Sequence, residues 1–181
     1  MNTKDIVYIA LFAALTAVLG LFPPITLLGG VPITAQSLGP MLAGAILGAR
    51  RGGLSILLFL VLVAVGLPLL SGGRGGFGVF AGPTGGFLVG YVAAAFVIGF
   101  LVEKFWTQMN VFTAALSIAT GGILVMYLIG NAWWALVTDF TYLEVTVIAA
   151  SFLIGDAIKV AIATVVCLAV RRSYPLISKA R

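Results

Sequence analysis

Long apolar runs, separated by short polar or glycine-rich segments, cover most of this chain. A membrane-spanning helix needs about 20 mostly apolar residues at a rise of about 1.5 Å per residue. A membrane β-strand would instead alternate polar and apolar residues over about ten positions. Because the runs are continuously apolar, they predict an all-α bundle of six transmembrane helices, over residues 5–22, 37–49, 54–70, 82–102, 111–130 and 143–170. Pro23 and Pro24 are expected to end the first helix.

The composition agrees with an integral membrane protein. Hydrophobic residues fill 62% of the 181 positions and charged residues fill 8%, whereas an average soluble domain is about 45–50% apolar and about 25% charged. A soluble globule of this size has too little interior to bury such an excess. No polar linker or second unit interrupts the pattern, so we predict a single transmembrane domain over residues 1–181.

The positions of the cations predict the orientation of the bundle, because cytoplasmic connections carry an excess of Lys and Arg. With six helices and a cytoplasmic N-terminus, Arg74 alone lies outside and Lys159 lies within the last helix. The other eight of the ten cations lie inside: Lys4, Arg50, Arg51, Lys104, Arg171, Arg172, Lys179 and Arg181. We therefore expect both termini in the cytoplasm. The net charge of +5 is interpreted as a topology signal, not as evidence for a nucleic-acid partner.

Several classes of chemistry lack their residues in this chain. There is no His, and Cys167 is the only cysteine, which excludes His-ligated metal sites, Ser-His-Asp triads and an intramolecular disulfide. The glycine-rich run 72–76 lacks the Lys and the Ser or Thr with which a P-loop holds phosphate and Mg²⁺. We therefore expect no enzyme, no cofactor, no metal site and no nucleotide hydrolysis by this chain itself.

Asp156 and Lys159 are charged residues that lie far from either end of a predicted membrane helix. Their i, i+3 spacing places them on one helix face, where they can contact each other. Each charge costs about 2.5–3.5 kcal/mol near the bilayer centre, and such residues usually line ligand or ion paths. The pair offers acceptor oxygens and N–H donors side by side. Two interpretations stay open: the pair binds a polar ligand, or the two charges only neutralise each other inside the bundle.

The predicted outer connections contain further candidates. Gln36 ends the first connection, and its alternative role is a hydrogen bond at a helix N-terminus. Arg74 in the glycine-rich second connection suits a ligand anion or an ordinary lipid headgroup. Asn131 begins the third connection and is alternatively a helix cap. Trp133 and Trp134, which follow it, are expected to be interfacial anchors.

Small residues recur at spacings that allow close helix packing. Gly82, Gly86 and Gly90 form a tandem Gly-x-x-x-Gly run, which favours packing of the fourth helix inside the bundle. The first helix carries two Ala-x-x-x-Ala pairs, formed by Ala10, Ala13, Ala14 and Ala17. This second pattern fits either internal packing or the docking of a partner protein.

Three sequence blocks resemble the BioY family, the biotin-specific substrate-capture (S) components of energy-coupling factor (ECF) transporters. The blocks are Arg51-Gly52-Gly53, the segment 82–91 with its Gly-Pro-Thr-Gly-Gly sequence, and Gly155-Asp156-Ala157-Ile158-Lys159. The resemblance covers essentially the whole chain. It implies a six-helix bundle of the bacterial or archaeal cell membrane that binds biotin near its extracellular side.

The resemblance also implies partners, which are a transmembrane coupling subunit joined to two cytoplasmic ATPase subunits. Membrane lipid is a further expected partner. The alanine positions of the first helix are similar to the family's docking face for that module. Two alternatives remain open. One is an S component for another vitamin, and the other is a stand-alone ion-coupled transporter in which Asp156 carries a proton.

The chemistry of biotin suggests a role for each candidate. We expect Asp156 and Lys159, with Asn131, to bind the ureido ring deep in the site, because a neutral polar group costs less to bury than a carboxylate. Arg74 or loop amides would then bind the carboxylate, and the reverse pose stays open. The remaining predicted biotin-site residues are Gln36, Leu69, Phe77, Val79 and Phe80, of which the last four are expected to form apolar walls or a lid.

Overall fold

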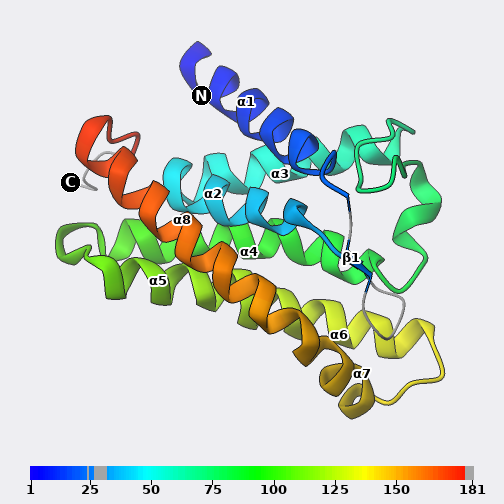
Figure 1. The fold of residues 1–181 in the computed structure, drawn as a ribbon. Helices are drawn as coiled ribbons and strands as arrows, with labels where there is room; N and C mark the ends of the chain where they lie inside the picture. Colours follow the sequence, from blue (N-terminus) through cyan, green and yellow to red (C-terminus); the bar gives the residue numbers. More distant parts are fainter. Residues whose placement is uncertain (24, 27–31, 178–181) are drawn as a thin grey trace.

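The computed structural model describes residues 1–23, 25–26 and 32–177. Pro24, Lys179 and Arg181, which the sequence predictions used, lie outside the described residues. The described chain is almost entirely helical (Figure 1). Its α-helices are α1 (Thr3–Leu19), α2 (Leu38–Leu47), α3 (Ala49–Ala64), α4 (Gly85–Lys104), α5 (Val111–Ala119), α6 (Met126–Val137), α7 (Tyr142–Ala149) and α8 (Leu153–Ser173). The strands β1 (Ile25–Thr26) and β2 (Pro32–Ile33) form a short antiparallel pair.

Several helical elements join into longer rods. A π-helical turn over Thr120–Val125 connects α5 to α6, and a 3₁₀ turn over Ala150–Phe152 connects α7 to α8. The segments Gly85–Lys104, Val111–Val137 and Tyr142–Ser173 are each long and apolar enough to cross a membrane. Large apolar side chains such as Leu11, Phe112 and Ile154 are exposed on the outside, as expected for a surface in contact with lipid. The prediction of an all-α membrane protein is confirmed.

Three predicted helix boundaries are wrong, and two of them belong to the third predicted helix, which ends as α3 at Ala64 and not at Leu70. The third predicted helix, 54–70, begins earlier as α3 because Gly48 takes a φ of 84° and separates α2 from α3. Glu103 accepts a hydrogen bond from the Ala49 N–H at 2.9 Å and so caps the start of α3. The fifth predicted helix does not end at Gly130, because that glycine packs against the Phe87 ring within a continuous rod.

α4 is the central helix of the bundle and packs against α2, α3 and α6. A Cβ added at Gly44 would lie 2.4 Å from the Ala95 carbonyl oxygen, so glycine there allows α2 and α4 to approach closely. Gly86 and Gly90 contact α6 in the same way, which confirms internal packing for these two. Gly82, by contrast, precedes α4 and has open space around it.

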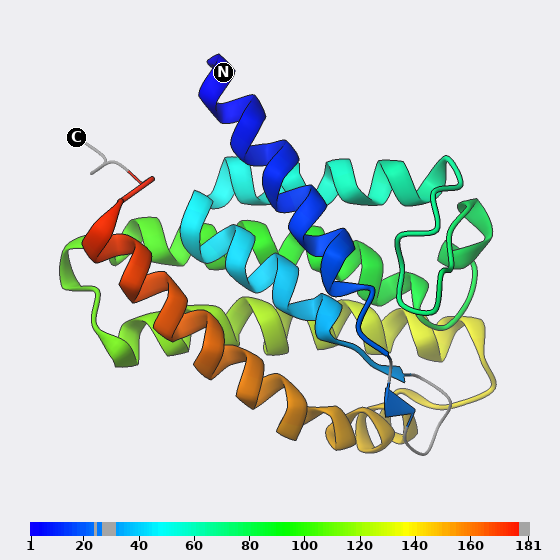
Figure 2. The ribbon, with the colours of Figure 1, turned by 45° about the horizontal axis from the view of Figure 1, so that its top comes forward.

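The two ends of the bundle differ in construction. The start of α1 and the end of α8 lie at one end (Figures 1 and 2). The strand pair, the connection from α3 to α4 and the connection from α6 to α7 lie at the opposite end. We call this second end the loop end. The loop end covers the cavity described next.

Candidate functional site

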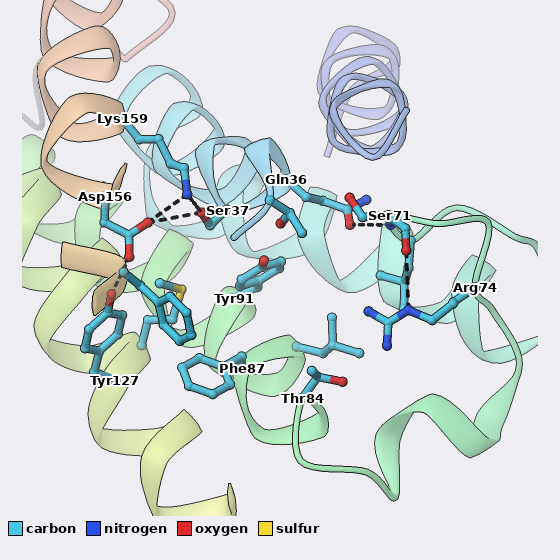
Figure 3. Close-up of a pocket in the computed structure, with 15 residues that line it drawn as sticks. Gln36, Ser37, Ser71, Arg74, Thr84, Phe87, Tyr91, Tyr127, Asp156 and Lys159 are labelled. Carbon is cyan, nitrogen blue, oxygen red and sulfur yellow. Dashed lines mark hydrogen bonds and ion pairs between the residues drawn. The ribbon is translucent and has the colours of Figure 1, made fainter. Parts of the chain in front are cut away.

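A cavity opens between the starts of α2, α4 and α8, the π-connected rod of α6, and the loop that follows α3 (Figure 3). Polar and apolar side chains both face it. Its lining residues are Thr34, Gln36, Ser37, Leu70, Ser71, Arg74, Thr84, Phe87, Leu88, Tyr91, Met126, Tyr127, Phe152, Asp156 and Lys159. Five separate stretches of sequence therefore build one site.

Asp156 and Lys159 form an ion pair on α8, with 2.8 Å between Lys159 Nζ and Asp156 Oδ1. Lys159 Nζ also donates to the Ser37 hydroxyl at 2.8 Å, and that hydroxyl lies 3.4 Å from Asp156 Oδ1. The Tyr127 hydroxyl donates to the other carboxylate oxygen, Oδ2. Both charges are largely shielded from solvent, since 4% of the Asp156 side chain and 12% of the Lys159 side chain are exposed.

The hydrogen bonds within the cluster of Asp156, Lys159, Ser37 and Tyr127 leave donor and acceptor positions for a ligand. An ammonium group has three N–H donors, and two of those of Lys159 have partners among the described residues. Asp156 Oδ2 accepts one hydrogen bond there, from Tyr127, and an ionised carboxylate oxygen accepts about two. The cluster therefore presents one N–H donor beside one acceptor oxygen, which suits a ligand edge that carries both N–H and C=O groups.

Gln36 lines the cavity, but its amide is already bonded to protein. Its Nε2 donates to the carbonyl oxygens of Thr16 at 3.2 Å and Leu69 at 2.8 Å, and its Oε1 accepts from the Ser71 N–H at 3.2 Å. Gln36 thus ties the end of α1 to the loop that follows α3. Gly20 leaves the space for this amide, because a Cβ there would lie 2.6 Å from Gln36 Nε2.

Arg74 lies on the opposite side of the cavity from the ion pair, with Tyr91 and Phe87 between them in Figure 3. Its Nε donates to the Ser71 carbonyl at 3.3 Å, and its backbone N–H donates to the Leu70 carbonyl at 3.3 Å. Gly72 and Gly73 take φ values of 79° and 70° and make this tight turn. The rest of the guanidinium has no hydrogen-bond partner among the described residues, and it faces the cavity (Figure 3).

Five predicted biotin-site residues do not line the cavity in this structure. Phe77 is 79% exposed, while Val79 and Phe80 are half-buried against the core. Leu69 also packs on the core, and its neighbour Leu70 faces the cavity instead. They flank the site without contacting it.

Asn131 is the fifth of these residues, and the structure corrects its predicted place on a connection. It lies within α6, six positions before the helix ends at Val137, so it is not a cap either. It is 1% exposed, and its Nδ2 lies 3.4 Å from the Thr146 hydroxyl. Its Oδ1 has no hydrogen-bond partner among the described residues. Trp134 is likewise buried inside a cluster between α6 and α7 rather than at an interface, while Trp133 donates to the Gly82 carbonyl at 3.1 Å.

Sequence reasoning missed the aromatic wall of the cavity. The Phe87 and Tyr127 rings meet edge to face at 6.2 Å between centroids, and Tyr91 is buried beside them. Phe87 and Tyr91 have an i, i+4 spacing within the Gly-Pro-Thr-Gly-Gly segment, which places both on one face of α4. That spacing, with tyrosine hydroxyls inside a predicted membrane helix, is the signal that identifies them.

The alanines of α1 point in different directions. Ala10 and Ala14 are exposed, Ala13 is 3% exposed in the core, and Ala17 is half-buried. One Ala-x-x-x-Ala pair therefore forms part of the outer surface of α1, and the other contributes to packing within the bundle.

A family model described as the BioY family matches residues 1–176 of this chain. The chain belongs to the BioY family. The resemblance seen in the sequence is confirmed, and it extends over nearly the full chain.

Relatives within the family carry the name biotin transporter BioY. The chain is 47% identical to the one from Rhizobium etli, with 98% of each chain covered. It is 44% identical to the one from Rhodobacter capsulatus, with 95% of each covered. A solved structure, the S-component for biotin from an ECF-type ABC transporter, matches with a TM-score of 0.94 and 30% identity over 100% of both chains.

Proposed function

We propose that this chain is the biotin-binding S component of an ECF-type transporter in the cell membrane. The observation that carries the proposal is the buried Asp156–Lys159 pair, which offers a donor and an acceptor to a cavity walled by aromatic rings. The family and the solved S-component for biotin support biotin as the ligand. No catalytic step is needed, because the substrate is bound and moved unchanged.

The geometry supports one orientation of biotin over the other. The ureido carbonyl would accept a hydrogen bond from the third N–H of Lys159, and a ureido N–H would donate a hydrogen bond to Asp156 Oδ2. The bicyclic body would lie against Phe87 and Tyr91, and the carboxylate would reach Arg74 on the other side of the cavity. The reverse orientation would place the ligand carboxylate beside that of Asp156, where like charges repel in a buried site.

The other predicted site residues take supporting roles in this proposal. Gln36 holds the loop that carries Arg74, and Leu69 accepts one of its hydrogen bonds. Phe77, Val79 and Phe80 form the outer cover that follows this loop. Asn131 is buried on α6, where its Nδ2 lies 3.4 Å from the Thr146 hydroxyl of α7. None of these needs to contact biotin directly.

We propose six membrane spans for the whole chain as one domain, with both termini in the cytoplasm. The six spans would be α1, α2, α3 and the three longer segments; α1, α2 and α3 have 17, 10 and 16 residues. Placing the loop end outside puts the cavity toward the extracellular side. It also leaves Lys4, Arg50, Arg51, Arg171 and Arg172 at the cytoplasmic end, as the cation bias requires.

The transport partners in this proposal are a transmembrane coupling subunit and two cytoplasmic ATPases. The chain has no P-loop sequence, so ATP hydrolysis has to come from another subunit. The exposed small side chains of Ala10 and Ala14 allow a partner helix to approach α1 closely. Ala13 is not available on this surface, because it lies in the core.

Uptake into cells that lack their own biotin transporter tests this function. Cells that express the chain together with an ECF coupling subunit and its two ATPases should accumulate labelled biotin. They should continue to do so after the proton gradient is collapsed. Cells that carry an ATPase variant unable to hydrolyse ATP should not. Accumulation that stops when the proton gradient is lost would favour an ion-coupled carrier and contradict the proposal.

A further inference from the structure

The rod from α5 to α6 contains one residue more than a regular α-helix over the same path would contain. Six of its buried positions follow one another at intervals of four residues, from Ala114 to Trp134. They are Ala114, Ile118, Gly122, Met126, Gly130 and Trp134. In a regular α-helix each step of four advances by about 40° around the axis, so the last position would lie about 200° from the first. The π turn over Thr120–Val125 absorbs an extra residue and keeps the two halves facing inward.

Close packing surrounds the π turn on two sides. A Cβ at Gly121 would lie 2.4 Å from Ile98 Cγ1 and 2.7 Å from the Ala94 carbonyl oxygen of α4. A Cβ at Gly122 would lie 2.7 Å from Met41 Cε of α2. Two adjacent glycines therefore let the wide turn lie against both helices. The direction in which α6 leaves this turn is set by the packing.

Tyr127 is the second residue after this turn, and it lies beside Asp156 of α8 in the wall of the cavity (Figure 3). Its ring packs edge to face on Phe87, and its hydroxyl donates to Asp156 Oδ2. Had the same sequence continued as a regular helix, Tyr127 would be turned by about 100° and would not reach Asp156. The π turn and this hydrogen bond are thus parts of one arrangement.

The Asp156 carboxylate needs this contact to hold its orientation. Lys159 and Ser37 both bind Oδ1. The terminal torsion of an Asp side chain has broad minima, so contacts at Oδ1 alone leave Oδ2 free to swing. Tyr127 contacts Oδ2 from a ring that Phe87 supports. The remaining lone pair of Oδ2 is then held toward the cavity.

We propose that Tyr127 is a positioning residue for ligand binding: it orients the Asp156 carboxylate toward the substrate N–H, and the π turn at Thr120–Val125 places it there. This inference rests on the proposed function. It assigns to the hydroxyl a role that works through Asp156 and needs no contact with the ligand.

Tyr127→Phe tests the role, with Tyr142→Phe as the matched control. Tyr142 is 46% exposed at the start of α7 and does not line the cavity. A hydrogen bond to a charged group is worth about one to two factors of ten in an equilibrium constant. We expect Tyr127→Phe to weaken the binding of labelled biotin to the purified chain by about tenfold. Tyr142→Phe should bind as the parent does.

Two readouts separate positioning from a general packing role. The first readout is the infrared spectrum of the ligand-free protein. The carboxylate band of Asp156 is identified as the band that disappears in Asp156→Asn. This band should shift in Tyr127→Phe. In an Asp156→Asn background, Tyr127→Phe should cause no further loss of affinity. An unchanged band, or an equal loss in both backgrounds, would overturn the inference. If the parent chain itself binds no biotin, the proposed function fails, while the infrared result still decides whether Tyr127 orients Asp156.

Discussion

Asp156→Asn is the substitution that separates ligand binding from simple charge neutralisation most sharply. The asparagine keeps the size of the side chain, and its carbonyl oxygen can face Lys159 and Ser37 as Oδ1 does now. Its amide nitrogen then takes the place of Oδ2, so a donor faces the ligand N–H where an acceptor stood. Loss of a hydrogen bond to a charged group costs about 1.5–3 kcal/mol. We therefore expect biotin affinity to fall by about 10- to 150-fold.

The assay is equilibrium binding of labelled biotin to purified protein in detergent, with Asp139→Asn as the control. Asp139 is exposed on the connection between α6 and α7 and does not line the cavity. The control variant should retain the parent affinity. An Asp156→Asn protein that binds biotin as tightly as the parent would refute the assignment of the site.

A double variant tests the alternative that the ion pair only neutralises two buried charges. Removing one partner of a buried pair typically costs about 3–5 kcal/mol of stability, while replacing both by uncharged groups of similar size is often neutral. Asp156→Asn combined with Lys159→Met should therefore unfold at a temperature close to that of the parent. It should nevertheless fail to bind biotin. Binding retained in this stable double variant would mean that the pair has no role toward the ligand.

Three further predictions concern the mouth of the cavity, the loop support and the outer face of α1. Arg74→Gln should weaken the binding of biotin by about tenfold but leave the binding of biotin methyl ester unchanged, because the ester lacks the anion that Arg74 binds. Equal losses of affinity for both ligands in competition assays would argue against this pose. Gln36→Leu should lower the thermal unfolding temperature, because it leaves the buried Ser71 N–H without its acceptor, which costs about 1–3 kcal/mol; an unchanged unfolding temperature would contradict that. Ala14→Trp should abolish biotin uptake in cells and leave biotin binding by the purified chain intact, whereas Phe112→Trp on the exposed face of α5 should affect neither. Normal uptake with Ala14→Trp would show that the outer surface of α1 is not part of the docking interface.

The membrane class and the central ion pair could be predicted because they depend on local sequence properties. Continuous apolar runs identify helices in a membrane, and the i, i+3 spacing of Asp156 and Lys159 places them together on any helix. The structure confirms their contact at 2.8 Å. Neither inference required knowledge of how distant helices pack.

The rest of the site depends on contacts between distant segments and on local departures from regular helix geometry. Gln36 and Ser71 are 35 positions apart, and no local pattern indicates that their side chain and backbone meet. Tyr127 reaches Asp156 only because a π turn precedes it, and regular helical spacing does not predict such a turn. Asn131 was misplaced for the same reason, because the rod continues past Gly130 through packing on Phe87.

Equilibrium dialysis of labelled biotin against the purified chain alone, without coupling or ATPase subunits, tests the central claim most directly. The account predicts saturable binding of one biotin per chain, because every residue assigned to the site belongs to this one chain. Excess unlabelled biotin should displace the label, and chemically unrelated vitamins should not. A chain that is folded in detergent and shows no saturable biotin binding would contradict the account.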